Sequence, residues 1–325
     1  MSDSADRAHQ GPRTACRVMR VRQLASRLGP AWALTLVVLV VDAGWMVLGG
    51  WSVSASRLGM TALALAAVLA PLAFGRCRRN LRIRTTLNCL SLLIVFQVAG
   101  LSFSYLVVST NAPLVDAPLA AWDSALGFDW QALHGWLQNH PSVQATLGTA
   151  YNSAMAQVWF VVLFLGLSAQ PERLNEFMRL FIFATLLVIL ASGPFPAAGT
   201  WKQYSIGQPF DLSSLSHFEL LRSGQMREIP LGHTQGLVSI PSLHAAMTVF
   251  LVYTMRQTRL LLPAVFALNV EMLASTPFYG SHYLVDVLAG LALALGLIAL
   301  ERRRNALPGV TTKFVRAGHL EAARQ

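Results

Sequence analysis

The chain has 325 residues, of which 54% are hydrophobic and 12% are charged. Soluble domains carry about 25% charged residues, so the composition excludes an ordinary soluble domain and is typical of a polytopic membrane protein. A net charge of +10 could indicate nucleic-acid binding in a soluble protein. The basic residues here form no patch interleaved with aromatic side chains, so we expect no nucleic-acid partner.

Long apolar segments recur along the chain. A hydrocarbon core of about 30 Å needs about 20 apolar residues per helix. The candidate spans are 31–50, 59–75, 87–108, 145–168, 177–196, 242–257, 260–278 and 283–300. Because the second and sixth are short, we predict an all-α transmembrane bundle of about six to eight spans. Polar side chains within the spans are expected to form interhelical hydrogen bonds; they are Asp42, Asn152, Gln157, Asn269 and Glu271.

The spans divide the chain into four regions. Residues 1–30 form a basic tail, and residues 31–144 hold N-terminal transmembrane helices with an outer amphipathic loop. Residues 145–303 form a transmembrane catalytic core, and residues 304–325 form a second tail. The polar, arginine-rich start predicts no cleavable signal peptide.

The distribution of Lys and Arg predicts the orientation. With the N-terminus inside, the inner segments hold 21 of the 25 Lys and Arg residues. The outer side keeps Arg57, Lys202, Arg222 and Arg227. This positive-inside pattern predicts a multi-pass protein of the inner, or plasma, membrane with both termini in the cytoplasm. Its basic excess would face anionic membrane lipids.

The first long outer loop, 109–144, has no Lys or Arg. Its apolar residues recur at helical spacing, which suits an amphipathic helix in the interface, since tryptophan favours the headgroup level. A helix packed over the bundle is an interpretation at least as good. The carboxylates of the loop are Asp116, Asp123 and Asp129, and its tryptophans are Trp122, Trp130 and Trp136.

His282 and Asp286 open the last apolar segment. At positions i and i+4 of a helix they would share a face and could hydrogen-bond. An aspartate that accepts from one imidazole nitrogen fixes the tautomer and leaves the other nitrogen as a nucleophile or base. Gly290, one turn further, would let a neighbouring helix approach closely. For this pair alone, a structural role that joins two helices is equally favoured.

A second cluster, Pro241-Ser242-Leu243-His244, opens the sixth segment. Pro241 suits the first turn of a helix, and the free N–H groups there would form an anion site with Ser242. His244 could donate a proton to a leaving oxygen. Taken alone, the better explanation is that Ser242 caps the helix and His244 reaches to the interface. One helical hairpin separates the clusters, so both should lie on the outer side and meet. Together they favour phosphate chemistry.

The two clusters carry a family resemblance. Gly236-Leu-Val-Ser-Ile-Pro-Ser-Leu-His244 and Gly280-Ser-His282-Tyr-Leu-Val-Asp286 resemble the type 2 phosphatidic acid phosphatase superfamily, and more closely its inositol phosphorylceramide synthase-like branch. The resemblance implies that His282 is the nucleophile that takes the phosphoryl group and that His244 is the general acid. Asp286 would orient His282, and Ser242 would help to hold the phosphate. The implied reaction passes through a phosphohistidine and needs neither a metal nor a cofactor.

Two departures from the phosphatases concern the cations that hold phosphate. The phosphatases carry a K-x6-R-P motif before the first cluster. In this chain Lys202 lies at the place of the motif's lysine, but Pro209 stands where the arginine should be. The arginine expected seven residues before the nucleophile is Ser275 here. The synthase-like branch commonly lacks both features. A phosphoryl transition state still needs positive charge near its oxygens, and the candidates in the long loop are, in order, Lys202, Arg227 and Arg222.

The sequence thus predicts an integral membrane lipid phosphatase or phosphotransferase. Its substrate would be a lipid phosphate or phospholipid at the outer membrane face, with a periplasmic or extracellular active site. A phospholipid head-group transferase is the alternative, because the two clusters do not separate attack by water from attack by an alcohol. A non-enzymatic lipid-binding or transport protein, and metal-dependent hydrolysis by His244, His282 and Asp286, are less favoured. The sequence indicates neither a particular lipid nor an oligomeric state.

Overall fold

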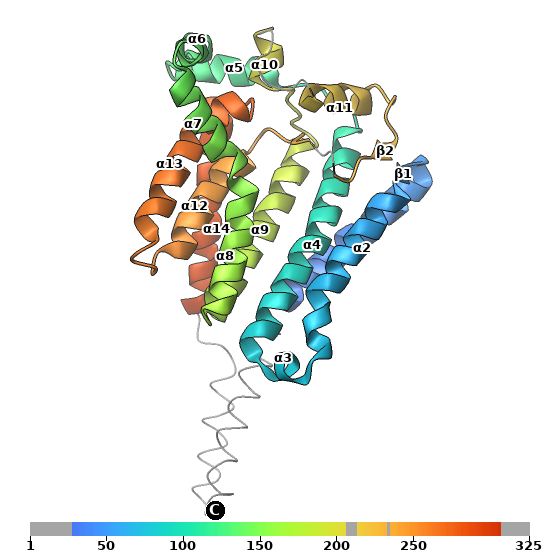
Figure 1. Cartoon of the computed structure of the whole chain (residues 1–325). Coiled ribbons are helices and arrows are strands. Elements are labelled where there is room, and N and C mark those ends of the chain that lie inside the picture. The colour runs from blue at the N-terminus through green and yellow to red at the C-terminus, as the bar shows by residue number, and fades with distance from the viewer. Residues whose placement is uncertain (1–27, 206–212, 233–234, 307–325) are drawn as a thin grey trace, which may run out of the picture.

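The computed structural model describes residues 28–205, 213–232 and 235–306. Within them the chain is the predicted all-α bundle, with one small sheet (Figure 1). After an initial helix, Leu28–Gly49, the α-helices are α2 (Ala55–Leu69), α3 (Gly75–Arg79), α4 (Leu81–Val108), α5 (Asp116–Ala125), α6 (Trp130–Gln138), α7 (Pro141–Asn152), α8 (Ala154–Leu167), α9 (Pro171–Ser192), α10 (Thr200–Gln203), α11 (Ser213–Arg222), α12 (Leu243–Met255), α13 (Leu262–Tyr279) and α14 (Leu284–Ala306). A 3-10 turn, η1 (Ala70–Ala73), follows α2, and β1 (Ser52–Val53) pairs in parallel with β2 (Glu228–Ile229).

The long helices stand side by side, and short ones cover one end of the bundle. Helices α5, α6, α10 and α11 gather at this end, called the loop end below, and α3 lies at the opposite end (Figure 1). Helix α3 carries Arg76, Arg78 and Arg79. The loops that the sequence assigns to the outer side and this basic helix are therefore at opposite ends of the bundle.

Five described helices are long and apolar enough to cross a membrane. They are Leu28–Gly49, Ala55–Ala73, Leu81–Val108, Pro171–Ser192 and Leu284–Arg304. A sixth span results if α7 and α8, bent by 47° at their junction, count as one. Helix α12 has only 13 residues, and α13 contains Asn269, Glu271 and Pro277, which reduce its hydropathy. The count therefore lies at or just below the lower end of the predicted range, because two predicted spans are a short and a partly polar helix.

The packed centre of the bundle lies around α4 and α9. Their most apolar windows are 78% and 67% buried, whereas the window of α2 is 0% buried. Phe96 of α4 packs edge-on against Phe181 of α9, with ring centroids 6.1 Å apart. Helix α2 therefore lies at the outside of the bundle, with its apolar surface left for lipid.

Polar side chains inside the helices behave in two ways. Asn269 Nδ2 donates to Gln157 Oε1 at 2.8 Å, which confirms the predicted interhelical bond. The prediction is wrong for Asp42, because both of its carboxylate oxygens are buried and neither has a hydrogen-bond partner in the described part of the chain. No donor of a neighbouring described helix reaches it.

Helices α5 and α6 pack over the bundle. Trp130 is 1% exposed, and its Nε1 donates to the carbonyl oxygen of Pro277 at 2.9 Å. Trp122 and Trp136 are 57% and 51% exposed on the outer side of these helices. Residues 109–144 thus form helices that pack over the bundle, and two exposed tryptophans leave the interfacial placement a prediction.

Candidate active site

The two clusters meet at the loop end. Helix α12 begins directly after Ser242, and the N–H of Ser242 donates to the carbonyl oxygen of Asp286 at 2.9 Å. A Cβ atom on Gly290 would lie 2.3 Å from the carbonyl oxygen of Ser242. The predicted close helix approach at Gly290 is thus confirmed, and it brings the starts of α12 and α14 together.

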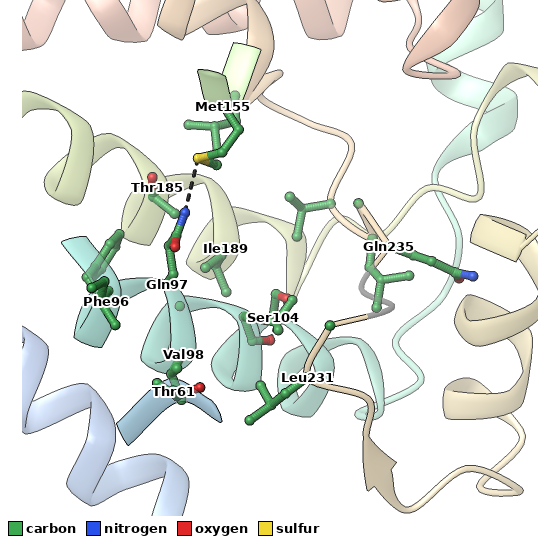
Figure 2. A pocket seen from close by; sticks show the side chains of 18 of the residues that line it. Thr61, Phe96, Gln97, Val98, Ser104, Met155, Thr185, Ile189, Leu231 and Gln235 are labelled. Atoms are coloured by element: carbon green, nitrogen blue, oxygen red, sulfur yellow. Dashed lines mark hydrogen bonds between the residues drawn. The ribbon is translucent and has the colours of Figure 1, made fainter. Parts of the chain in front are cut away.

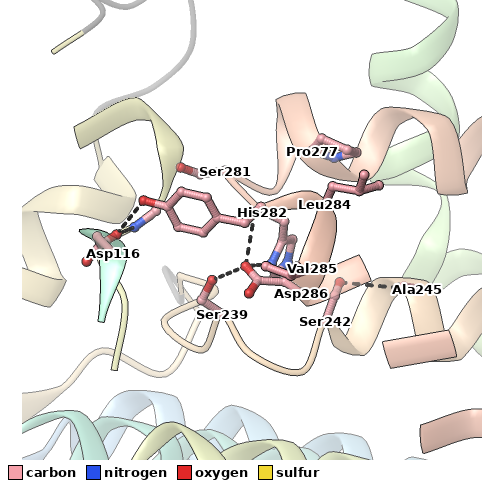
Figure 3. Close-up of polar contacts among 12 residues, drawn as sticks. Asp116, Ser239, Ser242, Ala245, Pro277, Ser281, His282, Leu284, Val285 and Asp286 are labelled. Carbon is pink, nitrogen blue, oxygen red and sulfur yellow. Dashed lines mark hydrogen bonds and ion pairs between the residues drawn. The ribbon is translucent and has the colours of Figure 1, made fainter. Parts of the chain in front are cut away.

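The His–Asp pair forms, although not within one helix. His282 precedes α14 and Asp286 lies in its first turn, with His282 Nδ1 3.3 Å from Asp286 Oδ2 (Figure 3). The two side chains are 5% and 0% exposed. When Nδ1 carries the proton and donates to the carboxylate, Nε2 keeps its lone pair. The arrangement can therefore present Nε2 as a nucleophile.

Asp286 Oδ2 has two further donors that the sequence reading missed. Ser239 Oγ donates to it at 2.6 Å, and the N–H of Tyr283 donates at 3.0 Å (Figure 3). Ser239 lies three residues before Ser242 in the stretch that carries the resemblance. Its polar side chain among apolar neighbours was the signal available in the sequence.

His244 lies in the first turn of α12, stacked on Tyr151 of α7. The ring centroids are 4.2 Å apart and the planes differ by 20°. A Cβ atom on Gly280 would lie 2.5 Å from His282 Cδ2 and 3.0 Å from the Tyr151 hydroxyl. His244, through Tyr151, and His282, through Gly280, therefore flank one small region.

Ser242 is the N-cap of α12, and its Oγ accepts from the N–H of Ala245 at 3.4 Å. Pro241 precedes the cap and follows Ile240 through a cis peptide bond, so its predicted place in the first helical turn is wrong. Serine is preferred as an N-cap over an apolar residue, which moves the helix start to Leu243. Capping leaves the N–H groups of Leu243 and His244 as donors at the helix start.

Helix α5 contributes two carboxylates that the sequence analysis did not assign to the site. Asp123 is 0% exposed and accepts from the N–H groups of Leu284 (2.8 Å) and Val285 (3.0 Å), the first residues of α14. Burial raises the pKa of the Asp123 carboxyl, while these two bonds lower it. Asp123 thus caps the helix that carries Asp286.

Asp116 fixes the other flank of the cluster. Its carboxylate accepts from the Tyr283 hydroxyl at 2.9 Å and from the N–H groups of Ala198 and Gly199 at 2.9 and 2.8 Å (Figure 3). Asp116 and Asp123 are seven residues apart, so they share one face of α5. The seven-residue spacing of these carboxylates, in a loop without Lys or Arg, was the sequence signal that could have assigned both to the site.

The structure separates the three candidate cations. Lys202 of α10 pairs with Glu219, and both side chains are well exposed. Its neighbour Trp201 donates its N–H to Ser281 Oγ at 3.1 Å, so α10 is attached next to His282. Arg227 lies 5.2 Å above the ring of Trp51, beside the β1–β2 sheet.

Arg222, ranked last from the sequence, has a buried Nη1 atom with no hydrogen-bond partner among the described residues. Its guanidinium lies 5.4 Å from the ring centroid of Phe218. Burial lowers the pKa of this guanidinium, and the nearby charge of Asp116 raises it. Arg222 therefore has one buried donor atom that no described residue uses.

Among the described residues, no group of three His, Cys, Asp or Glu side chains is arranged to hold a metal ion. His244, His282 and Asp286 form no such group in the described part of the chain. Asp286 Oδ2 is instead engaged by His282 and by two other donors.

Comparison with known proteins identifies the family of the chain. The family model of the PAP2 superfamily matches residues 117–300, which include both clusters and all of α5 except its first residue, Asp116. No match is found among curated proteins or among solved structures. Since the matched range is more than half of the chain, the protein belongs to the PAP2 superfamily.

Proposed function

We propose that the protein is a lipid phosphatase or phosphotransferase that works through a phosphohistidine on His282. Membership of the PAP2 superfamily supports a phosphatase-type lipid enzyme. The observation that carries the proposal is the buried His282–Asp286 pair beside the start of α12, where His244 lies. A pair that only joined two helices would not need a second histidine next to it.

The proposed reaction has two steps. His282 Nε2 attacks phosphorus and forms a P–N bond, the ester P–O bond breaks, and His244 gives its proton to the departing alkoxide. Water or a second alcohol then attacks phosphorus, the P–N bond breaks, and His244 takes the proton back. Asp286 stabilises the imidazolium through Nδ1, and Ser242 with the free N–H groups of α12 holds the phosphate oxygens.

Positive charge to neutralise the phosphate oxygens would come from the Lys and Arg residues that the sequence assigns to the outer side. We propose Lys202 first, because an exposed ion pair contributes little free energy and can be exchanged for a substrate phosphate. The buried, unpartnered Nη1 of Arg222 supports that residue as the second candidate. Arg227 is the weakest of the three, since its stacking on Trp51 explains its position by packing.

Orientation in the membrane is part of the proposal. The arginine count favours both termini in the cytoplasm of an inner, or plasma, membrane, and an active site at the outer face. In a cysteine-free background, Leu126→Cys at the loop end should react with an impermeant maleimide from outside, whereas Arg78→Cys in α3 should not. The reverse labelling pattern would contradict this orientation.

Hydrolysis and head-group transfer are the two outcomes of the second step. Transfer, as in inositol phosphorylceramide synthases, is favoured by Ser275, which replaces the phosphatase arginine and is buried with its hydroxyl on Met272 O. Purified protein in detergent should be given radiolabelled lipid phosphates with and without alcohol acceptors, and with and without a chelator. Free labelled phosphate would indicate a phosphatase, and an exchanged head group a transferase.

Two variants test the mechanism in the same assay. His282→Ala should abolish turnover, and full activity of this variant would contradict the proposal. His244→Ala should lower kcat for a lipid phosphate by at least about a hundredfold, the usual share of general acid catalysis. It should lose much less with p-nitrophenyl phosphate, because that leaving group needs no proton. Equal losses for both substrates would exclude His244 as the acid.

A further inference from the structure

A cavity of about 800 Å³ opens between α2, α4, α8 and α9, below the segment that leads to α12 (Figure 2). This volume falls within the range of roughly 300–1,000 Å³ that is usual for ligand sites. Side chains such as Met60, Phe96, Trp159 and Ile189 make the lining predominantly apolar. It therefore suits a hydrocarbon ligand.

Most walls of the cavity are helices that could cross a membrane. Helices α2, α4 and α9 are all candidate spans, and the surface of α2 is not buried by the rest of the chain. Residues Arg57, Met60, Thr61 and Ala64 of α2, spaced three or four apart, form one face toward the cavity. A ligand in this place would come from the lipid phase.

The segment before α12 contacts both this cavity and the catalytic cluster. Val238 and Leu243 line the cavity. The residues next to them in the chain, Ser239 and Ser242, contact Asp286 through a side chain and a backbone N–H. A molecule in the cavity therefore lies directly behind the residues that hold the catalytic carboxylate.

One cation belongs to the cavity. Arg57 is the only charged residue that lines it within the described part of the chain. A Cβ atom on Gly232 would lie 2.8 Å from Arg57 Nη1, so Gly232 leaves the space that the guanidinium occupies at the edge of the loop end. An apolar space with one cation at its edge matches an anionic lipid.

We infer that this cavity binds the hydrocarbon chain of the phosphorylated lipid substrate. The inference rests on the proposed function and adds a requirement for a long chain. Helix α2 and the cavity-lining part of α4 precede residue 117, where the family match begins, so this wall is supplied by the N-terminal half of the chain.

The test places a large side chain in the cavity by substituting a residue of α2, its exposed wall. Ala64→Trp places an indole in the cavity, and Ala66→Trp, on the opposite face of α2 and also exposed, is the matched control. Both variants are assayed with dioleoyl and with dihexanoyl phosphatidic acid. In the His282→Ala background, binding of a fluorescent long-chain phosphatidic acid is measured independently of turnover. Thr61→Phe serves as a second filling variant if Ala64→Trp does not fold.

Ala64→Trp should raise KM for the long-chain substrate roughly tenfold, with kcat and the short-chain KM nearly unchanged, because it removes binding and not chemistry. It should weaken binding of the fluorescent lipid by a similar factor, while Ala66→Trp should resemble the wild type. Unchanged long-chain KM and binding would overturn the inference, as would equal losses for both chain lengths. Wild-type protein that binds the lipid in an Ala64-dependent way but neither hydrolyses nor transfers it would refute the proposed function alone.

Discussion

At the scale of single residues, the site depends on one carboxylate oxygen. Asp286 Oδ2 accepts hydrogen bonds from His282 Nδ1, Ser239 Oγ and the N–H of Tyr283. The Asp286 side chain is buried, at 0% exposed. A buried carboxylate needs its donors, because an unpaired charge in a low dielectric is costly. The donors therefore satisfy the buried Oδ2 atom and hold His282 in one direction.

Ser239→Ala tests this dependence. Loss of one charge-assisted hydrogen bond, worth about 1.5–3 kcal/mol, should lower kcat by roughly tenfold or more and leave KM nearly unchanged. Ser239→Thr keeps the hydroxyl and should restore most of the rate. Ser192→Ala is the matched control, since that buried hydroxyl bonds only Val188 O of its own helix. Equal kcat values for Ser239→Ala and Ser192→Ala would show that Ser239 does not position the pair.

At the scale of elements, α5 joins the loop of residues 109–144 to α14. Asp123 caps the start of α14, and Asp116 joins Tyr283 to the chain that enters α10. A helix start buried without such acceptors would leave unsatisfied N–H groups. The outer loop is therefore a part of the site and not only its cover.

Asp123→Ala should reduce both stability and rate. Removing the cap costs about 0.5–2 kcal/mol of unfolding free energy, and more if both buried N–H groups stay unpaired. Because α14 carries Asp286, kcat should fall as well. Asp129 caps α6 through the N–H of Ala132 at 2.9 Å, so Asp129→Ala is a cap deletion away from α14. Thermal melts should move down for both variants, and a kcat loss shared by Asp129→Ala would contradict a specific role for Asp123.

Helix α6 should make the loop end sensitive to acid. His134 stacks on the buried Trp130 with centroids 4.7 Å apart, and burial lowers the pKa of His134 from its ordinary 6.5. The neutral ring is favoured in the folded state, so its contribution to stability is full above pH 6.5 and is lost as the pH falls toward the folded pKa.

The measurement is the thermal midpoint at about pH 7.5 and about pH 5.5, a range in which histidine titrates. The decrease in thermal midpoint between the two pH values should be smaller in His134→Phe than in the wild type. This variant keeps an aromatic ring on Trp130. His140→Phe replaces an exposed ring stacked on Trp136 and should keep the wild-type drop. An identical drop in all three proteins would exclude His134 as the source.

At the scale of the whole molecule, much of the bundle and the meeting of the two clusters follow from the sequence. Apolar runs predicted the helices, and Gly290 predicted the close contact between α12 and α14. The role of α5 did not follow, because it depends on which face of that loop helix packs inward. The role of Ser239 did not follow either, because it depends on how the segment before α12 folds against α14. Asp123 reaches residues 161 and 162 positions away, and no periodicity in a single sequence contains such pairings. The cavity was equally hidden, since its lining comes from five separate helices and from the segment before α12.

The largest stability effect is expected far from the site, where α9 meets α14. Arg179 forms an ion pair with Glu301, and their side chains are only 5% and 11% exposed. Glu301→Ala should lower the unfolding free energy by about 3–5 kcal/mol, because it leaves a buried guanidinium without its carboxylate. The double variant Arg179→Met/Glu301→Leu should recover most of that loss, since a packed apolar pair needs no compensation. Denaturant unfolding in detergent of the four proteins of this cycle gives the coupling energy directly. A double variant as unstable as Glu301→Ala would mean that the cost comes from lost packing and not from the unpaired charge.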